Sequence, residues 1–386
     1  MAVPKALTMG ALFLTALAAI SCVSSNSNQF DSSFYTTPSK FPTDAPGSVV
    51  RFETMAAPVV DSQAWRVMYT STGVESEPIV VSGMVFSPTG PAPEGGRPIV
   101  TWAHPTTGIE DPCAPSRSSR PYDDVQGLTE FLAKGWVVVA SDYQGLGTDG
   151  PHPYLVGSSE AHATIDIVRA ATHLDGVSAS SNYMVFGHSQ GGQAALFVGQ
   201  IANDYAPDLR LLGVAAAAPA GELASLFNAD RDNASGVVLG SYAVQSWAEV
   251  FGYDPSTVVN SFASKRVERV AKRCVVGASK ASDIELGIDD VILRGRMWSA
   301  DPSSTPPWQE QFTINTPGQV SIPVPVLITQ GTADKIIAPA TTAELVTTYT
   351  SQGTNASEQL LPGVDHMNAG KESVPYVVSF FSSLVK

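Results

Sequence analysis

Cysteine and charged residues are both scarce in this sequence of 386 residues. Only 15% of the residues are charged, against 44% hydrophobic ones, which argues against a disordered chain and predicts a large buried core. The 22 basic residues face 36 acidic ones, so the formal net charge is −14, and no block of Lys and Arg occurs. Because such a surface repels phosphate groups, we expect no nucleic-acid partner.

Motifs that hold cofactors are also missing from the sequence. It has no HExxH, no CxxC and no paired histidine spacing, so we predict no metal site. Gly145-Leu146-Gly147 follows a predicted strand but lacks the third glycine of a dinucleotide-binding loop, and a plain turn explains it better. We therefore expect no cofactor.

The first residues have the pattern of an export signal. Lys5 precedes an apolar stretch, Ala6 to Ile20, that is too short to span a bilayer comfortably, and a buried first helix is the alternative. Ala19 and Ser21 fit an ordinary cleavage site, but the same stretch is also a relaxed lipobox in which Cys22 would carry lipid. We expect an exported protein, either secreted or anchored through Cys22 on the outer side of the cytoplasmic membrane.

The three cysteines form an odd set for an exported protein. If Cys22 carries lipid, Cys113 and Cys274 remain as a disulfide pair in an oxidising compartment. Two free buried thiols are the alternative.

Strand-like and helix-like stretches alternate along the chain. Short runs rich in Val, Ile and aromatic residues predict buried strands at Ile79–Phe86, Pro98–Ala103, Trp136–Ser141, Tyr183–Phe186, Leu211–Ala217 and Pro325–Thr329. Helical spacing of apolar residues predicts helices at Ser158–His173, Gln190–Tyr205 and Ala340–Tyr349. This alternation predicts an α/β protein with a mostly parallel sheet.

Composition divides the chain into four parts. We expect a signal peptide in residues 1–21, a Ser- and Asn-rich flexible tether in 22–37, ordered structure from near Pro38, a core in 38–220 and 321–386, and an insertion in 221–320. The insertion has no clear buried-strand run and reads as mainly helical. A cap or lid over the site is the preferred interpretation, because strand-like sequence resumes directly after it, and an accessory domain is the alternative.

One motif predicts a nucleophile. Gly187-His188-Ser189-Gln190-Gly191 fits G-x-S-x-G, lies directly after the strand Tyr183–Phe186 and directly precedes a helix. A strand–serine–helix turn is so tight that its neighbours must be small, which Gly187 and Gly191 satisfy. We expect the side chain of His188 to point away from Ser189; an idle serine in a Gly-rich turn is the alternative.

The partners of Ser189 follow from chain order. In α/β proteins with a G-x-S-x-G turn between a strand and a helix, the catalytic residues occur along the chain in the order serine, acid, histidine. His366 is the one histidine after the motif, and we place it in a loop before the last helix. Asp334 follows the strand Pro325–Thr329 and is the expected acid. Asp365 is the competitor, but neighbours in sequence rarely point their side chains at each other, and Asp142 precedes the serine and is read as structural.

Backbone N–H groups must then stabilise the oxyanion of an acyl-transfer reaction. Gln190, directly after the nucleophile, is the expected first donor. The second should come from the loop after Pro98–Ala103, where Pro105 has no N–H, so we select Thr106 or Thr107.

Several segments together resemble the secretory lipase family: Trp102–Gly108, Asp111–Ser116, Asp142–Gly147, Pro151–Tyr154 and Gly187–Gly192. The resemblance runs from about Val67 to the C-terminus. It implies an α/β-hydrolase fold with a helical cap and hydrolysis of carboxylic esters, often acylglycerols. Cys113 lies where the family often has a disulfide cysteine, whereas His104-Pro105 departs from the His-Gly that we expect there.

The sequence therefore predicts an exported serine carboxylester hydrolase, a lipase or esterase acting on an ester or lipid through an acyl-enzyme. An acyltransferase or a peptidase could use the same residues, and a catalytically silent binding protein could keep the same fold. The sequence does not indicate the acyl chain length or the oligomeric state.

Overall fold

The computed structural model of the protein describes residues 32–275 and 280–385. The predicted signal peptide, residues 1–21, and the predicted lipidation site Cys22 lie outside the described residues. The same holds for the expected tether up to residue 31.

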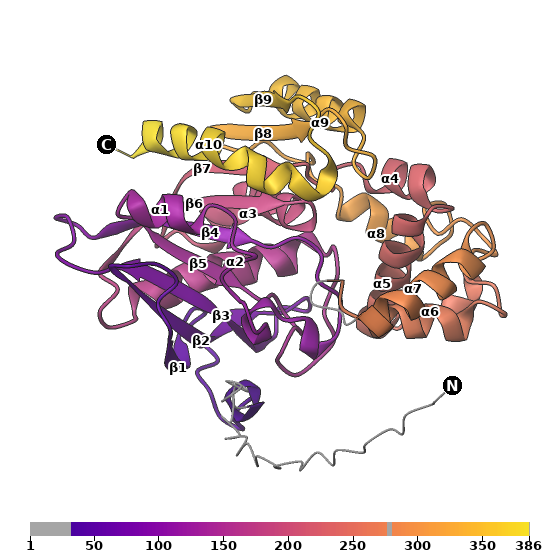
Figure 1. Ribbon diagram of the computed structural model, residues 1–386, viewed down its shortest axis with the longest axis horizontal. Coiled ribbons are helices and arrows are strands. Elements are labelled where there is room, and N and C mark those ends of the chain that lie inside the picture. Colours follow the sequence, from indigo (N-terminus) through magenta and orange to yellow (C-terminus); the bar gives the residue numbers. More distant parts are fainter. Residues whose placement is uncertain (1–31, 276–279, 386) are drawn as a thin grey trace, which may run out of the picture. The chain divides into compact units, whose positions relative to one another are not determined.

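A single sheet of nine strands forms the centre of the described part of the chain, in the order β1-β2-β3-β5-β4-β6-β7-β8-β9 (Figure 1). The strands are β1 (Val49–Met55), β2 (Ser62–Thr72), β3 (Pro78–Pro88), β4 (Arg97–Ala103), β5 (Val137–Ser141), β6 (Ala179–His188), β7 (Arg210–Ala217), β8 (Val326–Gly331) and β9 (Ala356–Leu361). All six predicted strands are confirmed, within a few residues at their ends. The first three strands pair antiparallel, and β5, β4, β6, β7, β8 and β9 run parallel.

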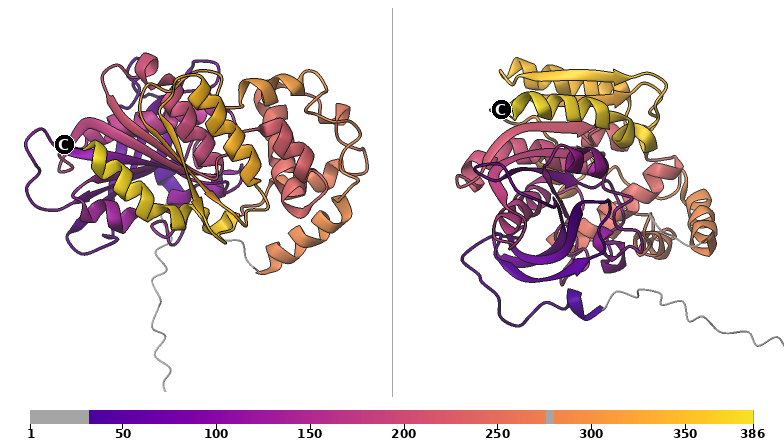
Figure 2. Two further views of the ribbon diagram at one scale, coloured as in Figure 1. Left: turned by 90° about the horizontal axis from the view of Figure 1, so that it is seen from above. Right: turned by 60° about the vertical axis from the view of Figure 1, so that its left-hand side comes forward.

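Helices cover both faces of this sheet (Figure 2). One face packs against α2 (Gly157–Thr172), α3 (Gln190–Tyr205) and α9 (Pro339–Ser351), and the other against α1 (Leu128–Ala133) and α10 (His366–Leu384). Alternate strand residues enter the two cores: Val139 and Val185 face α2 and α3, whereas Trp102 and Phe186 face α1 and α10. Each such fully buried side chain contributes about 1.5–3 kcal/mol to folding.

Residues 221–320 form a separate group of helices between β7 and β8 (right in Figure 1). It comprises α4 (Leu223–Asp230), α5 (Ala234–Phe251), α6 (Ser264–Ala271), α7 (Lys280–Leu293) and α8 (Trp308–Ile314). The group has its own core, centred on Trp247 and Trp308. The side chain of Asn233 accepts a hydrogen bond from the N–H of Gly236 and so caps the start of α5.

Four short 3-10 helices complete the regular structure of the described residues: η1 (Ser32–Tyr35), η2 (Asp111–Cys113), η3 (Pro115–Arg117) and η4 (Pro255–Thr257). Cys113 of η2 and Cys274, which follows α6, form a disulfide with a sequence separation of 161 residues. The predicted pairing is therefore confirmed. The disulfide ties the loop after β4 to the helical insertion.

Ordered structure begins before Pro38, where the sequence analysis placed it. Phe34 and Tyr35 of η1 are only 6% and 5% exposed, and the hydroxyl of Tyr35 is 2.8 Å from Ser116 Oγ. The Ser- and Asn-rich composition hid these two aromatic residues, whose burial outweighs the flexibility of their neighbours.

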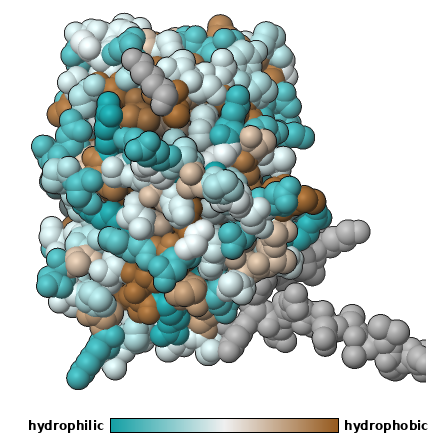
Figure 3. Space-filling model, turned by 90° about the vertical axis from the view of Figure 1, so that its left-hand side faces the viewer, coloured by the Kyte–Doolittle hydropathy of each residue, from teal (hydrophilic) through white to brown (hydrophobic). Residues whose placement is uncertain are grey.

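The end of the molecule opposite the insertion shows hydrophobic residues in separate patches among hydrophilic ones (Figure 3). Among the helices of the described residues, none combines the length and the apolar character that crossing a membrane requires.

Candidate active site

Ser189 lies in a strained turn between β6 and α3. Its φ of 58° is in the left-handed region, which a residue with a side chain rarely adopts. A Cβ on Gly187 would lie 1.9 Å from the carbonyl oxygen of Gly191, and a Cβ on Gly191 would lie 1.9 Å from that of Ala103. Both glycines of the motif are therefore required for this close approach of three backbone segments.

His366 brings its two ring nitrogens to a serine and to a carboxylate. Its Nε2 is 2.9 Å from Ser189 Oγ, and its Nδ1 is 2.8 Å from Asp334 Oδ2. The structure thus brings together the three residues selected from the sequence. His366 is the first residue of α10 and not part of a preceding loop, because Asp365 caps this helix by accepting the N–H of Asn368 at 3.1 Å. Asp365 is thereby occupied with the backbone.

Asp334 follows β8 and has both carboxylate oxygens occupied. Oδ1 accepts the backbone N–H groups of Ile336 and Ile337 at 2.9 and 2.8 Å, and Oδ2 faces His366 and accepts from Gln330 Nε2 at 3.2 Å. Burial alone would raise the pKa of Asp334, but the hydrogen bonds and the charge of His366 outweigh it, so the pKa lies below its ordinary value. This carboxylate stays ionised at neutral pH.

Two backbone contacts bring the loops after β8 and β9 together. The N–H of Ala333 donates to the carbonyl of Val364 at 3.0 Å. A Cβ on Gly331 would lie 2.3 Å from the same carbonyl oxygen. This close packing fixes Asp334 relative to His366, because each residue lies within three positions of the contact.

His188 also supports the histidine. Its Nε2 is 2.9 Å from the backbone carbonyl of His366, and the two rings lie 5.0 Å apart between centroids. Its side chain therefore contacts the chain at His366 and not the hydroxyl of Ser189. Burial lowers the pKa of His188 to about 3, so it is neutral and donates this hydrogen bond from Nε2.

An apolar cavity of about 700 Å³, including its open mouth, begins at Ser189. Ser189, Gln190 and Thr106 all contribute to its wall. Most of the remaining wall is apolar and comes from the helical insertion, with Leu223, Phe227, Leu239, Trp247 and Phe312. Side chains of α4, α5 and α8 therefore line the same cavity as the serine.

Two of the three predicted oxyanion donors line this cavity. Gln190 opens α3, so its N–H is one of the free N–H groups at a helix N-terminus. Thr106 also lines the cavity, and its hydroxyl is 2.8 Å from that of Tyr154. Thr107 is only 5% exposed, and its carbonyl accepts from the N–H of Val275 at 2.9 Å.

Asp142, which the sequence analysis interpreted as structural, is buried and accepts hydrogen bonds from surrounding groups. It accepts from the N–H of Ser116 at 2.8 Å and from Ser82 Oγ at 2.7 Å. Burial raises its pKa, and these hydrogen bonds oppose the rise. Within residues 32–275 and 280–385, His, Cys, Asp and Glu form no group of three or more suited to a metal ion.

Sequence reasoning missed Glu160. This residue of α2 is fully buried, and its Oε1 accepts from the N–H of Leu155 at 3.0 Å and from Gln190 Nε2 at 2.7 Å. Glu160 shares a helix face with the buried residues Thr164 and Ile167, and an acid at helical spacing from an aliphatic residue such as Ile167 was the available signal.

The segment before α2 joins the insertion to the site. The N–H of Tyr154 donates to Ser246 Oγ at 2.9 Å, and Trp247 Nε1 donates to the carbonyl of Tyr154 at 2.8 Å. The hydroxyl of Tyr154 lies beside Thr106. Helix α5 therefore supports the cavity wall next to Ser189.

Known proteins share both sequence and fold with this chain. "Lipase A" of Moesziomyces aphidis is 25% identical over 205 residues, 48% of this chain and 42% of its own length. A "probable inactive lipase" of Mycobacterium tuberculosis is 24% identical over 376 residues, 91% of this chain and 81% of its own. Except for the mycobacterial protein, the chain spans about half the length of the first curated relatives it matches.

Two solved lipolytic enzymes show the same fold. Candida antarctica lipase A in its closed state has a TM-score of 0.75 at 18% identity, covering 92% of this chain and 86% of its own. A ligand-bound form of the rice cell wall degrading esterase LipA from Xanthomonas oryzae has a TM-score of 0.70 at 22% identity, covering 88% of this chain and 99% of its own. The α/β-hydrolase fold is thus confirmed, and the "secretory lipase" family model matches residues 121–381. The chain belongs to the secretory lipase family.

Proposed function

We propose that this protein hydrolyses carboxylic esters through a covalent acyl-enzyme on Ser189. The observation that carries the proposal is the chain of hydrogen bonds from Ser189 Oγ to His366 and on to Asp334, at 2.9 and 2.8 Å, at the end of an apolar cavity. A serine hydroxyl is a weak nucleophile at neutral pH, and a neighbouring imidazole activates it by removing its proton.

The mechanism assigns a role to each side chain. His366 takes the proton of Ser189 as Oγ attacks the ester carbonyl, and later gives it to the leaving alcohol. Asp334 holds the ring with its proton on Nδ1 and stabilises the imidazolium that forms. Water then attacks the acyl-enzyme, with His366 taking its proton, and His366 returns a proton to Ser189 Oγ as the bond to the acyl group breaks and the carboxylic acid leaves.

The oxyanion requires donors fixed in advance. We assign the backbone N–H groups of Gln190 and Thr106 to this role, because both residues line the cavity beside Ser189. The N-terminus of α3 adds its partial positive charge at the same point. Thr106 lines the cavity and Thr107 does not, which favours Thr106 as the second donor.

The cavity also favours a class of substrate. Its walls are mostly aliphatic and aromatic side chains of the insertion, which fit the acyl chain of an ester or a lipid and give residues 221–320 the role of a cap. Relatives named "secreted triacylglycerol lipase" in Malassezia species support the same class and, with the N-terminal pattern, support export. Mass spectrometry of the mature N-terminus would show whether Cys22 carries lipid.

The test is hydrolysis of p-nitrophenyl esters with acyl chains from C2 to C16. We expect activity in the wild type, none in Ser189→Ala, and wild-type rates in Ser181→Ala, because Ser181 is an exposed residue at the far end of β6. The chain-length optimum separates an esterase from a lipase. Product analysis with an added alcohol identifies an acyltransferase.

A wild-type protein that is inactive on every ester would overturn the proposal. Hydrolysis of peptides alone would then point to a peptidase. Lack of any turnover would favour a silent scaffold, the state that the name of the mycobacterial relative suggests for that protein.

A further inference from the structure

A buried polar cluster lies directly behind Gln190, and the proposed reaction does not use it. Its centre is Glu160, whose Oε1 accepts from the N–H of Leu155 at 3.0 Å and from Gln190 Nε2 at 2.7 Å. Leu155 and Gln190 both line the cavity at Ser189. One carboxyl group therefore ties two parts of the cavity wall together.

No cation compensates this carboxyl group. Within the part of the chain that the structure describes, Glu160 forms no ion pair. Two uncharged rings, Tyr143 and Tyr154, lie near it, and the ring of His152 contacts Gln190, with 3.2 Å between His152 Nε2 and Gln190 Nε2. Burial lowers the pKa of His152 to about 3 and raises the pKa values of both tyrosines. A carboxylate here would be a buried charge without a counter-ion, so burial raises the pKa of Glu160 to about 8.

The cluster also has more hydrogen-bond acceptors than donors to pair with them. Two buried acceptor atoms, Glu160 Oε2 and Gln190 Oε1, have no partner. A buried acceptor that stays unpaired destabilises the folded state, because it loses its hydrogen bonds to water without replacing them. A proton on the carboxyl group turns one of the two acceptors into a donor, as in a carboxylic acid kept neutral to donate a hydrogen bond.

We propose that Glu160 is a positioning residue that works as a neutral carboxylic acid and holds Gln190, and with it the first N–H of α3, in place beside Ser189. The inference rests on the proposed function, in which this N–H binds the oxyanion. A neutral acid suits the position, because a buried negative charge behind the donor would oppose the charge that develops on the substrate oxygen.

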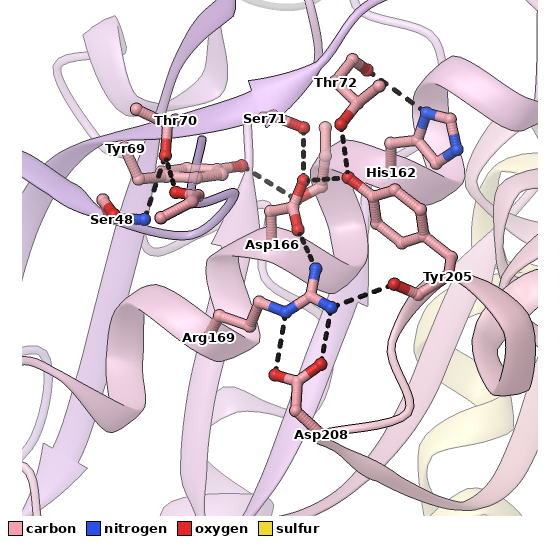
Figure 4. A network of polar contacts seen from close by, with 12 residues as sticks. Ser48, Tyr69, Thr70, Ser71, Thr72, His162, Asp166, Arg169, Tyr205 and Asp208 are labelled. Atoms are coloured by element: carbon pink, nitrogen blue, oxygen red, sulfur yellow. Dashed lines mark hydrogen bonds and ion pairs between the residues drawn. The ribbon is translucent and has the colours of Figure 1, made fainter. Parts of the chain in front are cut away.

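A second buried acid on the same helix provides the control (Figure 4). Asp166 accepts from Ser71 Oγ at 2.7 Å and from Tyr205 at 2.6 Å, and it has a counter-ion, Arg169, at 2.6 Å. Arg169 in turn pairs with Asp208 at 2.6 Å. None of these residues lines the cavity at Ser189, so Asp166→Asn removes a buried acid of α2 without touching the site.

The experiment compares pH profiles of kcat and KM for the wild type, Glu160→Gln, Glu160→Leu and Asp166→Asn. We expect kcat of the wild type to fall above about pH 8, as Glu160 loses its proton. Glu160→Gln, which is neutral at every pH, should keep its kcat near pH 7 and lose this decline. Glu160→Leu should lower kcat about 10- to 100-fold at an unchanged KM, because Gln190 loses its support. Asp166→Asn should keep the wild-type profile.

Infrared spectroscopy of the Ser189→Ala protein gives a readout that needs no hydrolysis. We expect the C=O band of a protonated carboxyl group near pH 7, lost in Glu160→Gln and kept in Asp166→Asn. Absence of this band, or an unchanged alkaline decline of kcat in Glu160→Gln, would overturn the inference while ester hydrolysis stands. A wild type without hydrolysis would overturn the proposed function, and the positioning role with it, even if the band is present. If Glu160→Leu does not fold, the Gln variant and the infrared band decide.

Discussion

Gly191→Ala should disable the site while leaving the fold in place. The added Cβ would lie 1.9 Å from the carbonyl oxygen of Ala103 and 2.7 Å from that of His104. Since a Cβ contact below 3.0 Å essentially never occurs, the start of α3 and the end of β4 must separate by at least 3.0 − 1.9 = 1.1 Å. These two segments carry Gln190 and Thr106, the proposed oxyanion donors.

The effect of such a displacement on the rate and on stability is known to an order of magnitude. Moving a reacting group by about 1 Å costs about 100-fold in rate, and the overpacking itself costs about 1–3 kcal/mol of stability. We therefore expect kcat/KM for a p-nitrophenyl ester to fall at least about 100-fold, whereas a domain of ordinary stability, about 5–15 kcal/mol, stays folded. Steady-state kinetics and a thermal melt on the same preparation measure both effects.

The chain offers a matched control for this substitution. Gly287 lies in α7, and a Cβ there would meet no atom within 4 Å apart from its chain neighbours and the backbone of its own helix. Gly287→Ala should keep full activity and raise helix stability by up to about 1 kcal/mol. Near-normal kcat/KM in folded Gly191→Ala would refute the argument that these three backbone segments set the geometry of the site.

Three further outcomes follow from the contacts. Asp334→Asn should lower kcat about 10,000-fold without unfolding the protein, because the amide leaves His366 in the wrong tautomer; a loss below tenfold contradicts this role. Replacing Cys113 and Cys274 by Ser should cost up to about 5 kcal/mol in urea unfolding, since the disulfide closes 161 residues, and reduced wild type should match the variant. Glu160 keeps its proton up to about pH 8 in the folded protein but only up to about pH 4.5 in the unfolded chain. The free energy of unfolding should therefore decrease by about 1.4 kcal/mol per pH unit as the pH rises from 4.5 to 8. Urea midpoints that fall equally in Glu160→Gln would contradict this.

The sequence was informative where a local rule decides the structure. The tight turn at Ser189 follows from its glycines, and each predicted strand carries the apolar run of a strand covered on both faces. β1 and β2 were missed because polar residues interrupt their apolar pattern. Arg66 of β2 is fully buried, yet it ion-pairs with Glu53 of β1 and donates to the carbonyl of Ser116 at 3.0 Å. Such partners come from distant segments and cannot be read from local pattern.

In the active site, too, some features follow from the local sequence and others depend on distant segments. Chain order and strand ends selected Ser189, Asp334 and His366, which the fold brings within hydrogen-bonding distance. The choice between Thr106 and Thr107 depends on how the loop after β4 meets the insertion, which only the three-dimensional structure shows. The sequence did not identify Glu160, because its role depends on its hydrogen bonds to Gln190 and Leu155, which belong to other segments of the chain.

The position of the insertion has a consequence for the order in which the chain can fold. β7 ends at Ala217, and its neighbour β8 begins at Val326, so ribosomes complete all the insertion helices before the sheet can be extended. Until then one edge of β7 carries unpaired backbone groups, an exposed strand edge of the kind that promotes aggregation. Ser189 is synthesised on one side of this interval, Asp334 and His366 on the other. A growing chain of 386 residues therefore carries its nucleophile from residue 189 until residue 366 is added, without the complete set of residues that would activate it.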